Sequence, residues 1–222
     1  MQISVTVSGL SRLFGDDLAA VVDVARIADD AGIHQLVMTD HLAIGPRTDR
    51  YPFAPKFPYP PEEPWLEPLT VLAAFAGATS RVRLGTGVLI GPLRPALVIA
   101  KAVATLDVVS RGRVDLGLGT GWQREEFTDA GLPFIGRTAR MEDAVRACRA
   151  LWETEPPVSF ASETVSFTDL WCEPRPLQAR LPIWFSGAAN DATVRRVAEL
   201  GDGWLPLAAT ASPRTWSPKA FR

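Results

Sequence analysis

Cysteine and histidine are scarce in this sequence, with two residues of each type among 222. The two cysteines, Cys148 and Cys172, stand alone in the chain. Two isolated thiols make neither a disulfide framework nor a metal site. We therefore expect a protein without a bound metal, and its cysteine content fits a reducing compartment.

Long apolar runs and an excess of one charge are missing too. No hydrophobic stretch reaches the length of a membrane span, and the N-terminus lacks the charged start and apolar core of a signal peptide. The formal net charge is −2 and the basic residues are scattered, which argues against nucleic acid and anionic membranes as partners. We expect a cytoplasmic protein that acts on a small-molecule substrate.

The sequence does contain enough apolar material, 47% of its residues, for a sizeable core. Segments typical of strands alternate with segments typical of helices about six times. The expected strands are 3–7, 35–38, 82–90, 114–118, 183–185 and 203–205, and the expected helices are 16–31, 65–79, 95–109, 137–153 and 190–200. A small hairpin is expected within 156–180. This alternation predicts a parallel sheet with helices outside it.

The predicted fold is an α/β barrel of the (β/α)8 TIM type, with about six of the eight units present. A complete barrel needs about 250 residues, more than this chain has. A doubly wound Rossmann-type sheet is the competing fold, because Gly117, Gly119 and Gly121 follow a strand. Their spacing is G-x-G-x-G instead of G-x-G-x-x-G, and no ribose-binding acidic residue follows at about 20 residues.

We expect one partial barrel domain over 1–207 and an irregular tail over 208–222. The tail contains two prolines and no apolar period, so it does not read as an amphipathic helix. Six units leave the first and last strands with unpaired edges, and exposed edges favour association. The sequence therefore also predicts a homodimer.

Functional residues of a parallel barrel lie at the carboxyl ends of its strands. In this sequence those ends carry Asp40 and His41, followed along the chain by three glycine-rich stretches at 85–88, 119–122 and 186–188. Glycine lets the backbone approach a flat or phosphorylated ligand, and the N-terminus of a following helix favours an anion. The strand ends therefore predict a site for a large phosphate-bearing cofactor.

Several short motifs occur in one order along the chain. They are Asp40-His41, WLEPLT at 65–70, RLGTGV at 83–88, GTGW at 119–122 with Glu125 and Glu126, PIWFSGA at 182–188 and GDGWLP at 201–206. As a set they resemble the luciferase-like monooxygenase family, and they are most similar to its branch that uses the deazaflavin coenzyme F-420. The family pattern continues past 206 with further elements, so we interpret the tail as a truncation.

The resemblance implies a site that binds a flavin or deazaflavin, with the phosphate near the loop after the fifth strand. A non-prolyl cis peptide bond is expected between Gly87 and Val88. The residues that the resemblance assigns to the cofactor are Asp40, Gly87, Val88, Gly119, Thr120, Gly121, Trp122, Ser186, Gly187 and Ala188.

In the deazaflavin branch an Asp-His pair lies beside the reacting carbon. His41 is then expected to be the general acid and base, since an imidazole titrates near neutral pH. Asp40 is expected to orient His41 or to bind the cofactor, and Glu125 or Glu126 to be a second proton donor. The predicted activity is hydride transfer between coenzyme F-420 (8-hydroxy-5-deazaflavin) and a small organic substrate.

Each of these assignments has an alternative. His41 could be structural, and the two glutamates could simply stabilise the first turn of a helix. The chain could instead be an FMN-dependent monooxygenase that uses molecular oxygen and a partner flavin reductase, or a non-catalytic remnant of a barrel. The long loop at 44–64, with Tyr51, Phe53, Phe57 and Tyr59 among prolines, is expected to cover the substrate.

Overall fold

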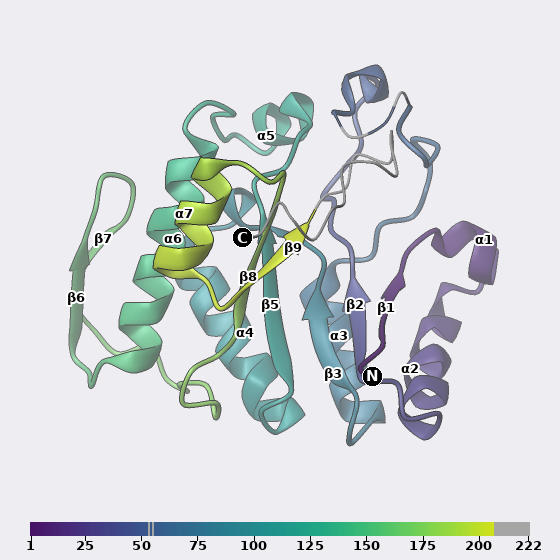
Figure 1. The fold of residues 1–222 in the computed structure, drawn as a ribbon, viewed down its shortest axis with the longest axis horizontal. Helices are drawn as coiled ribbons and strands as arrows, with labels where there is room; N and C mark the ends of the chain where they lie inside the picture. The colour runs from purple at the N-terminus through teal and green to yellow at the C-terminus, as the bar shows by residue number, and fades with distance from the viewer. Residues whose placement is uncertain (53, 55, 207–222) are drawn as a thin grey trace.

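A single curled sheet of parallel strands organises the molecule (Figure 1). The computed structural model describes residues 1–52, 54 and 56–206. Along the sheet the strands follow one another in chain order: β1 (Ser4–Val7), β2 (Gln35–Met38), β3 (Arg83–Thr86), β5 (Val114–Gly119), β8 (Ile183–Gly187) and β9 (Gly203–Pro206). A short strand, β4 (Leu89–Ile90), pairs with β5 beyond the end of β3. Spatial order that equals chain order is the arrangement of a (β/α) barrel.

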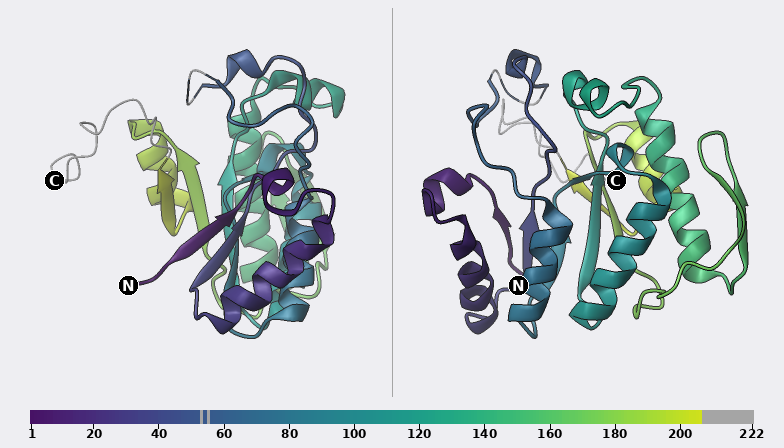
Figure 2. Two further views of the ribbon diagram at one scale, coloured as in Figure 1. Left: turned by 90° about the vertical axis from the view of Figure 1, so that its right-hand side faces the viewer. Right: turned by 180° about the vertical axis from the view of Figure 1, so that it is seen from behind.

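Helices connect successive strands and cover the outer face of the sheet (Figure 2, right). The connecting helices are α2 (Val21–Asp30), α3 (Pro68–Ala78), α4 (Ala96–Ser110), α6 (Arg137–Glu153) and α7 (Asp191–Leu200). Shorter elements are α1 (Leu10–Phe14), α5 (Arg124–Asp129) and the 3-10 turns η1 (Leu18–Ala20), η2 (Thr48–Arg50) and η3 (Gly91–Leu93). The expected hairpin is present as β6 (Val158–Ala161) and β7 (Ser166–Leu170), which pair antiparallel outside the main sheet.

The sheet curls so that its two edges turn towards the same side (Figure 2, left). Among the described residues, β1 pairs only with β2 and β9 pairs only with β8. The sheet is therefore an open part of a barrel, with six of its positions filled as the sequence predicts.

The hydrophobic core lies between the sheet and its helices. All six residues of β5 are buried, as expected for a strand in the middle of the sheet. On the inner face, by contrast, Gln35, Arg83 and Asp115 form a polar cluster at the amino ends of the strands, with Arg83 donating to both oxygens of Asp115 at 2.7 and 2.6 Å. This polar cluster and the apolar layer between sheet and helices hold the strands in place. The carboxyl ends of the parallel strands therefore lie together on one side of the sheet.

Three predicted elements differ by more than two residues or in kind from the observed ones, and the others agree to within two residues at each end. The strand expected over 82–90 divides into β3 and β4, because the backbone turns at Gly87 and Val88 and brings Leu89 beside Leu118 of β5. The helix expected from 65 starts at Pro68, where the side chain of Glu67 caps it. The helix expected over 16–31 begins as the 3-10 turn η1.

Within the residues that the structure describes, no helix combines the length and the apolar character that crossing a membrane requires. The predicted irregular tail at 208–222 lies outside the described residues.

Candidate functional site

A cavity of about 540 Å³ opens at the carboxyl ends of the strands. This volume is within the usual range of small-molecule sites. The cavity brings together residues that are far apart in the sequence, and all of the predicted cofactor residues line it: Asp40, Gly87, Val88, Gly119, Thr120, Gly121, Trp122, Ser186, Gly187 and Ala188. His41 lines it as well, whereas Glu125 and Glu126 stand behind the lining.

The imidazole of His41 is held by a buried carboxylate. His41 follows β2 and is 8% exposed, and its Nδ1 lies 3.1 and 3.3 Å from the two carboxylate oxygens of Glu126. The backbone N–H of Leu42 donates to Oε1 of the same carboxylate at 2.6 Å. Glu126 on α5 therefore fixes both the ring and the backbone next to it. A carboxylate that accepts from Nδ1 leaves Nε2 as the nitrogen able to exchange a proton in the cavity.

The adjacent glutamate faces another way. Glu125 lies 3.5 Å from Arg50 across the long loop, and it makes no ion pair with His41. Of the two glutamates proposed as proton donors, the structure thus brings only Glu126 to His41. Neighbouring helical residues point in directions about 100° apart, so only one of an adjacent pair can face the site.

Asp40 lies beside His41 in the chain, but its side chain turns into the protein. Its carboxylate accepts from both terminal nitrogens of Arg94, at 2.6 and 3.0 Å, and from the backbone N–H of Ile90 at 2.8 Å. Arg94 also donates to Glu67 at 3.1 Å. Burial acts to lower the pKa of Arg94, but the hydrogen bonds and charges of Asp40 and Glu67 outweigh it and raise that pKa. Asp40 therefore ties the end of β2 to β4.

Glycine at the floor of the cavity is required by close packing. The bond between Gly87 and Val88 is cis, as expected from the sequence. A Cβ on Gly119 would lie 2.5 Å from Cγ2 of Val88, so any side chain there would collide with this turn. Gly121 has a φ of 69°, and a Cβ there would meet Ile90 at 2.8 Å. These glycines line the cavity without side chains, so a flat ring can approach their backbone closely.

The opposite end of the cavity is suited to an anion. Ser186, Gly187 and Ala188 precede α7, whose N-cap residue Asn190 accepts from the backbone N–H of Thr193 at 2.9 Å. Arg196, one turn further along α7, lines the cavity and donates to Glu142 at 2.7 Å. The amino end of a helix and a guanidinium both favour negative charge.

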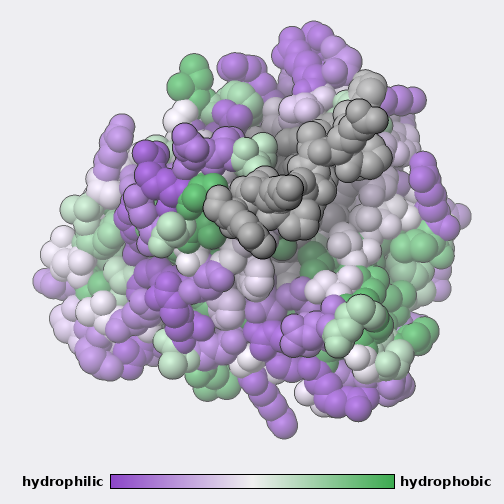
Figure 3. All heavy atoms as spheres, in the orientation of Figure 1, coloured by the Kyte–Doolittle hydropathy of each residue, from purple (hydrophilic) through white to green (hydrophobic). Residues whose placement is uncertain are grey.

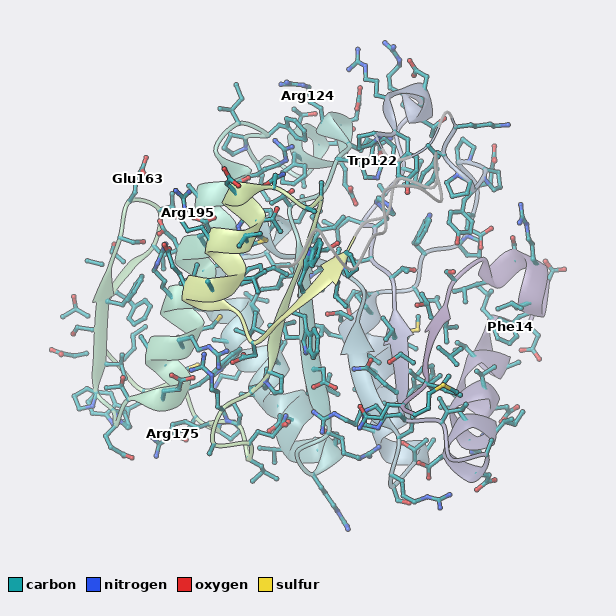
Figure 4. The ribbon with its side chains drawn as sticks, viewed as in Figure 1. Phe14, Trp122, Arg124, Glu163, Arg175 and Arg195 are labelled. Carbon is teal, nitrogen blue, oxygen red and sulfur yellow. The ribbon has the colours of Figure 1, made fainter. Side chains whose placement is uncertain are left out.

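Aromatic rings form the remaining wall. The long loop contributes Tyr51, Phe57 and Tyr59, while Trp65 precedes α3 and Trp122 follows β5. Figure 4 shows Trp122 at the upper end of the sheet, beside the loops. Phe53, predicted to belong to this group, lies outside the described residues.

Three residues that support the site were assigned no role from the sequence. Arg94 holds Asp40, and Arg196 supplies a cation to the anion end. Gln123 is buried and bonds both backbone groups of Gly45, at 2.9 and 3.0 Å, which fixes the long loop against the strand ends. Arg94 is 54 residues from Asp40, Arg196 is 54 residues from Glu142, and Gln123 is 78 residues from Gly45. No local sequence pattern indicates contacts between residues so far apart. No group of acidic, histidine or cysteine residues suited to a metal ion occurs in the part of the chain that the structure describes.

A family model and several known proteins match this chain, and they agree with one another. The model of the luciferase-like monooxygenase family matches residues 2–217. An uncharacterized protein of Mycobacterium tuberculosis is 32% identical over 82% of the chain. The F420-dependent glucose-6-phosphate dehydrogenase of Kineococcus radiotolerans is 34% identical over 83% of it, and the FMNH(2)-dependent dimethylsulfone monooxygenase of Pseudomonas putida is 32% identical over 63%.

Solved structures agree in fold. A monooxygenase from Streptomyces bottropensis superposes with a TM-score of 0.72 at 27% identity, covering 89% of this chain and 57% of that one. The predicted incomplete TIM-type barrel is confirmed by this likeness and by the curled parallel sheet. The chain spans 65% of the length of the mycobacterial relative, 51% of the Kineococcus enzyme and 39% of the Pseudomonas enzyme.

Proposed function

The chain belongs to the luciferase-like monooxygenase family, and from this premise we propose that it is an oxidoreductase that transfers a hydride between coenzyme F-420 and a small organic substrate. The observation that carries the proposal is the His41–Glu126 pair, 3.1 Å apart, at the wall of a cavity with a glycine floor. His41 at the wall can accept or donate a proton, and the glycine floor can hold a flat ring. Hydride transfer between a substrate and a ring cofactor needs both.

The residues of the cavity fit such a cofactor. Gly87, Gly119 and Gly121 line the cavity without side chains, so a planar ring can lie against their backbone. Ser186 and Arg196 lie at the end that favours a phosphate. A deazaflavin bound there would supply two-electron chemistry, accepting a hydride from a substrate carbon while the substrate hydroxyl gives up its proton.

The protein's own part in this reaction is to move that proton. With Nδ1 directed at Glu126, neutral His41 presents Nε2 as the acceptor for the proton of a substrate hydroxyl. Glu126 then faces an imidazolium and stabilises it. In the reverse direction the same nitrogen donates the proton to a carbonyl oxygen. Asp40 has a structural role in this proposal, because its carboxylate accepts hydrogen bonds from Arg94 and from the backbone N–H of Ile90.

Similarity to known relatives supports a deazaflavin over a flavin as the cofactor. The F420-dependent relative matches 83% of the chain and the FMNH(2)-dependent one matches 63%. FMN-dependent oxygenation is the second candidate, because that relative is itself 32% identical. It would require molecular oxygen and a flavin reductase as partner.

The two chemistries differ in whether oxygen is consumed. We expect the absorbance of oxidised coenzyme F-420 to fall when the protein and a suitable alcohol are present, with no uptake of oxygen. Oxygen uptake that requires reduced FMN would instead establish a monooxygenase. A lack of turnover with either coenzyme would contradict both and leave a non-catalytic barrel remnant as the interpretation.

A further inference from the structure

Five aromatic side chains next to His41 form one continuous surface, here called the aromatic wall: Tyr51, Phe57, Tyr59, Trp65 and Trp122. The ring centroid of Phe57 lies 5.1 Å from that of Tyr51, 5.2 Å from that of Trp122 and 5.7 Å from that of Tyr59. Tyr59 and Trp65 are 5.2 Å apart. These separations are typical of packed aromatic pairs, so the wall is a single apolar face.

The aromatic wall surrounds the imidazole that the proposed reaction uses. The ring of His41 lies 4.7 Å from Trp65, 5.8 Å from Phe57 and 6.1 Å from Trp122, all at steep angles. A substrate whose reacting hydroxyl or carbonyl reaches His41 must therefore place its neighbouring atoms against these rings. This step rests on the proposed function.

Few charged side chains line the cavity in the part of the chain that the structure describes. Among the described residues that line the cavity, the ionisable side chains besides the tyrosines are Asp40, His41 and Arg196. Asp40 is paired with Arg94 and His41 with Glu126, while Arg196 belongs to the end formed by Ser186 and α7. Among the described residues, a phosphate or carboxylate buried against the aromatic wall would find no cation free to pair with it. An unpaired buried charge is costly.

The cations of the long loop do not fill this role. Arg47 bonds Asp49 at 2.8 and 2.7 Å, and Arg50 lies 3.5 Å from Glu125. Lys56 is exposed, and none of the three lines the cavity. The loop thus places Tyr51, Phe57 and Tyr59 in the lining of the cavity and leaves these three cations outside it.

We propose that the substrate is an uncharged, largely apolar alcohol or ketone, with one polar oxygen for His41 and a hydrocarbon or aryl group for the aromatic wall. A sugar phosphate or another small anion does not match this surface. The aromatic wall thereby determines specificity within the activity proposed above.

Binding of two probes to the protein tests the substrate class without any turnover. The protein, free and with coenzyme F-420, is titrated with 4-phenyl-2-butanol and with glucose 6-phosphate while tryptophan fluorescence and binding heat are recorded. We expect saturable binding of the alcohol only. Tyr51→Ala should weaken it about tenfold, the size of a lost aromatic contact. Arg47→Ala, on the same loop but outside the cavity, should bind as the wild type does.

The outcomes separate the two proposals. Preference for glucose 6-phosphate, binding of neither probe, or equal binding by the wild type and a folded Tyr51→Ala variant would each overturn the substrate class. Circular dichroism and a melting curve establish that the variant is folded. Failure of coenzyme F-420 to bind would count against the proposed function, while the alcohol titration of the free protein would still report on the aromatic wall.

Discussion

Asp40 and Glu126 both lie beside His41, yet their oxygens have different partners. The Asp40 carboxylate is occupied by Arg94 and by the backbone of β4, so it holds the floor of the cavity in place. The Glu126 carboxylate faces Nδ1 of the imidazole and the N–H of Leu42, so it sets the direction of the ring. The two acidic residues therefore support the same histidine in different ways, one through the backbone and one through the ring.

Replacement of Glu126 should reduce turnover more than it reduces stability. Glu126→Gln keeps the shape of the side chain but removes the charge that faces His41. We expect the turnover rate with coenzyme F-420 to fall about 100-fold, near the lower end of what a positioned acid–base group contributes. Steady-state kinetics across pH, together with a melting curve, measure both effects.

The neighbouring residue provides the control. Glu125→Gln alters the same helix turn, but Glu125 faces Arg50 instead of His41. A smaller rate loss is expected for it. Equal losses in the two variants would show that the His41–Glu126 contact is not what the reaction depends on.

Asp29 should make stability depend on acidic pH. Its buried carboxylate accepts from the backbone N–H groups of Ser80, Arg81 and Val82 at 3.0, 2.8 and 2.6 Å. Burial acts to raise the pKa of Asp29, but these hydrogen bonds outweigh it and lower the pKa from 3.8 to about 2. A lowered pKa stabilises the folded state above pH 3.8, and this contribution is lost as pH falls through about 2.

Urea unfolding of Asp29→Asn measures this contribution. We expect the variant to be about 1–2 kcal/mol less stable than the wild type near neutral pH, since a hydrogen-bonded carboxylate is replaced by a poorer acceptor. The difference should shrink as the pH approaches 2. Asp30→Asn, at the exposed neighbouring position, should show neither effect. A difference that grows with acidity would contradict the assignment.

At the scale of secondary-structure elements, the strand ends could be predicted because glycine marks them in the sequence. Asp40 with His41 and the three glycine-rich stretches all follow strands, and the parallel sheet brings them to one side. The roles of the residues could not be predicted in the same way. Which of Glu125 and Glu126 faces His41 depends on how α5 is rotated. That Asp40 meets Arg94 depends on the turn between β3 and β4.

The contact between β3 and β5 sets the floor of the cavity and should tolerate no side chain at Gly117. A Cβ there would lie 2.0 Å from the backbone oxygen of Thr86. We expect Gly117→Ala to destabilise the protein by about 1–3 kcal/mol, as overpacking does. Gly77→Ala on α3, where a Cβ meets nothing within 4 Å, should instead stabilise it by about 0.5–1 kcal/mol.

Chemical denaturation of both variants measures their free energies of unfolding. It distinguishes a steric clash of the added Cβ from the general effect of replacing a glycine. Opposite signs are expected for the two substitutions. A neutral Gly117→Ala variant would mean that the strands can separate without cost, and that the floor of the cavity is less constrained than the close contact indicates.

At the scale of the whole molecule, the feature that bears on assembly is the edge of β1, which pairs with β2 alone within the described residues. Ile3 is 46% and Val5 is 37% exposed on this edge, and Leu13 and Ile27 are exposed nearby. Figure 3 shows hydrophobic residues gathered at the lower right, over the region of α1, α2 and β1. An apolar strand edge with free backbone groups favours pairing with another chain. We propose that this chain forms dimers through that edge.

Light scattering over a range of protein concentrations tests the proposal. The average mass of the wild-type chain should rise with concentration. Val5→Lys should lower it, because a charged residue on an edge strand opposes pairing. Val109→Lys, at an exposed position on α4, should leave the mass unchanged. A wild-type chain that stays monomeric throughout would contradict dimerisation through β1.

We propose that the cavity with the glycine floor binds coenzyme F-420 with its phosphate at Ser186. A fluorescence titration of the coenzyme against the wild type, Ser186→Asp and Ser186→Asn tests this most directly. We predict one saturable site per chain, and binding at least about tenfold weaker for Ser186→Asp than for Ser186→Asn, because only the aspartate places a like charge beside the phosphate. No saturable binding to the wild type, or equal affinities for the two variants, would contradict the account.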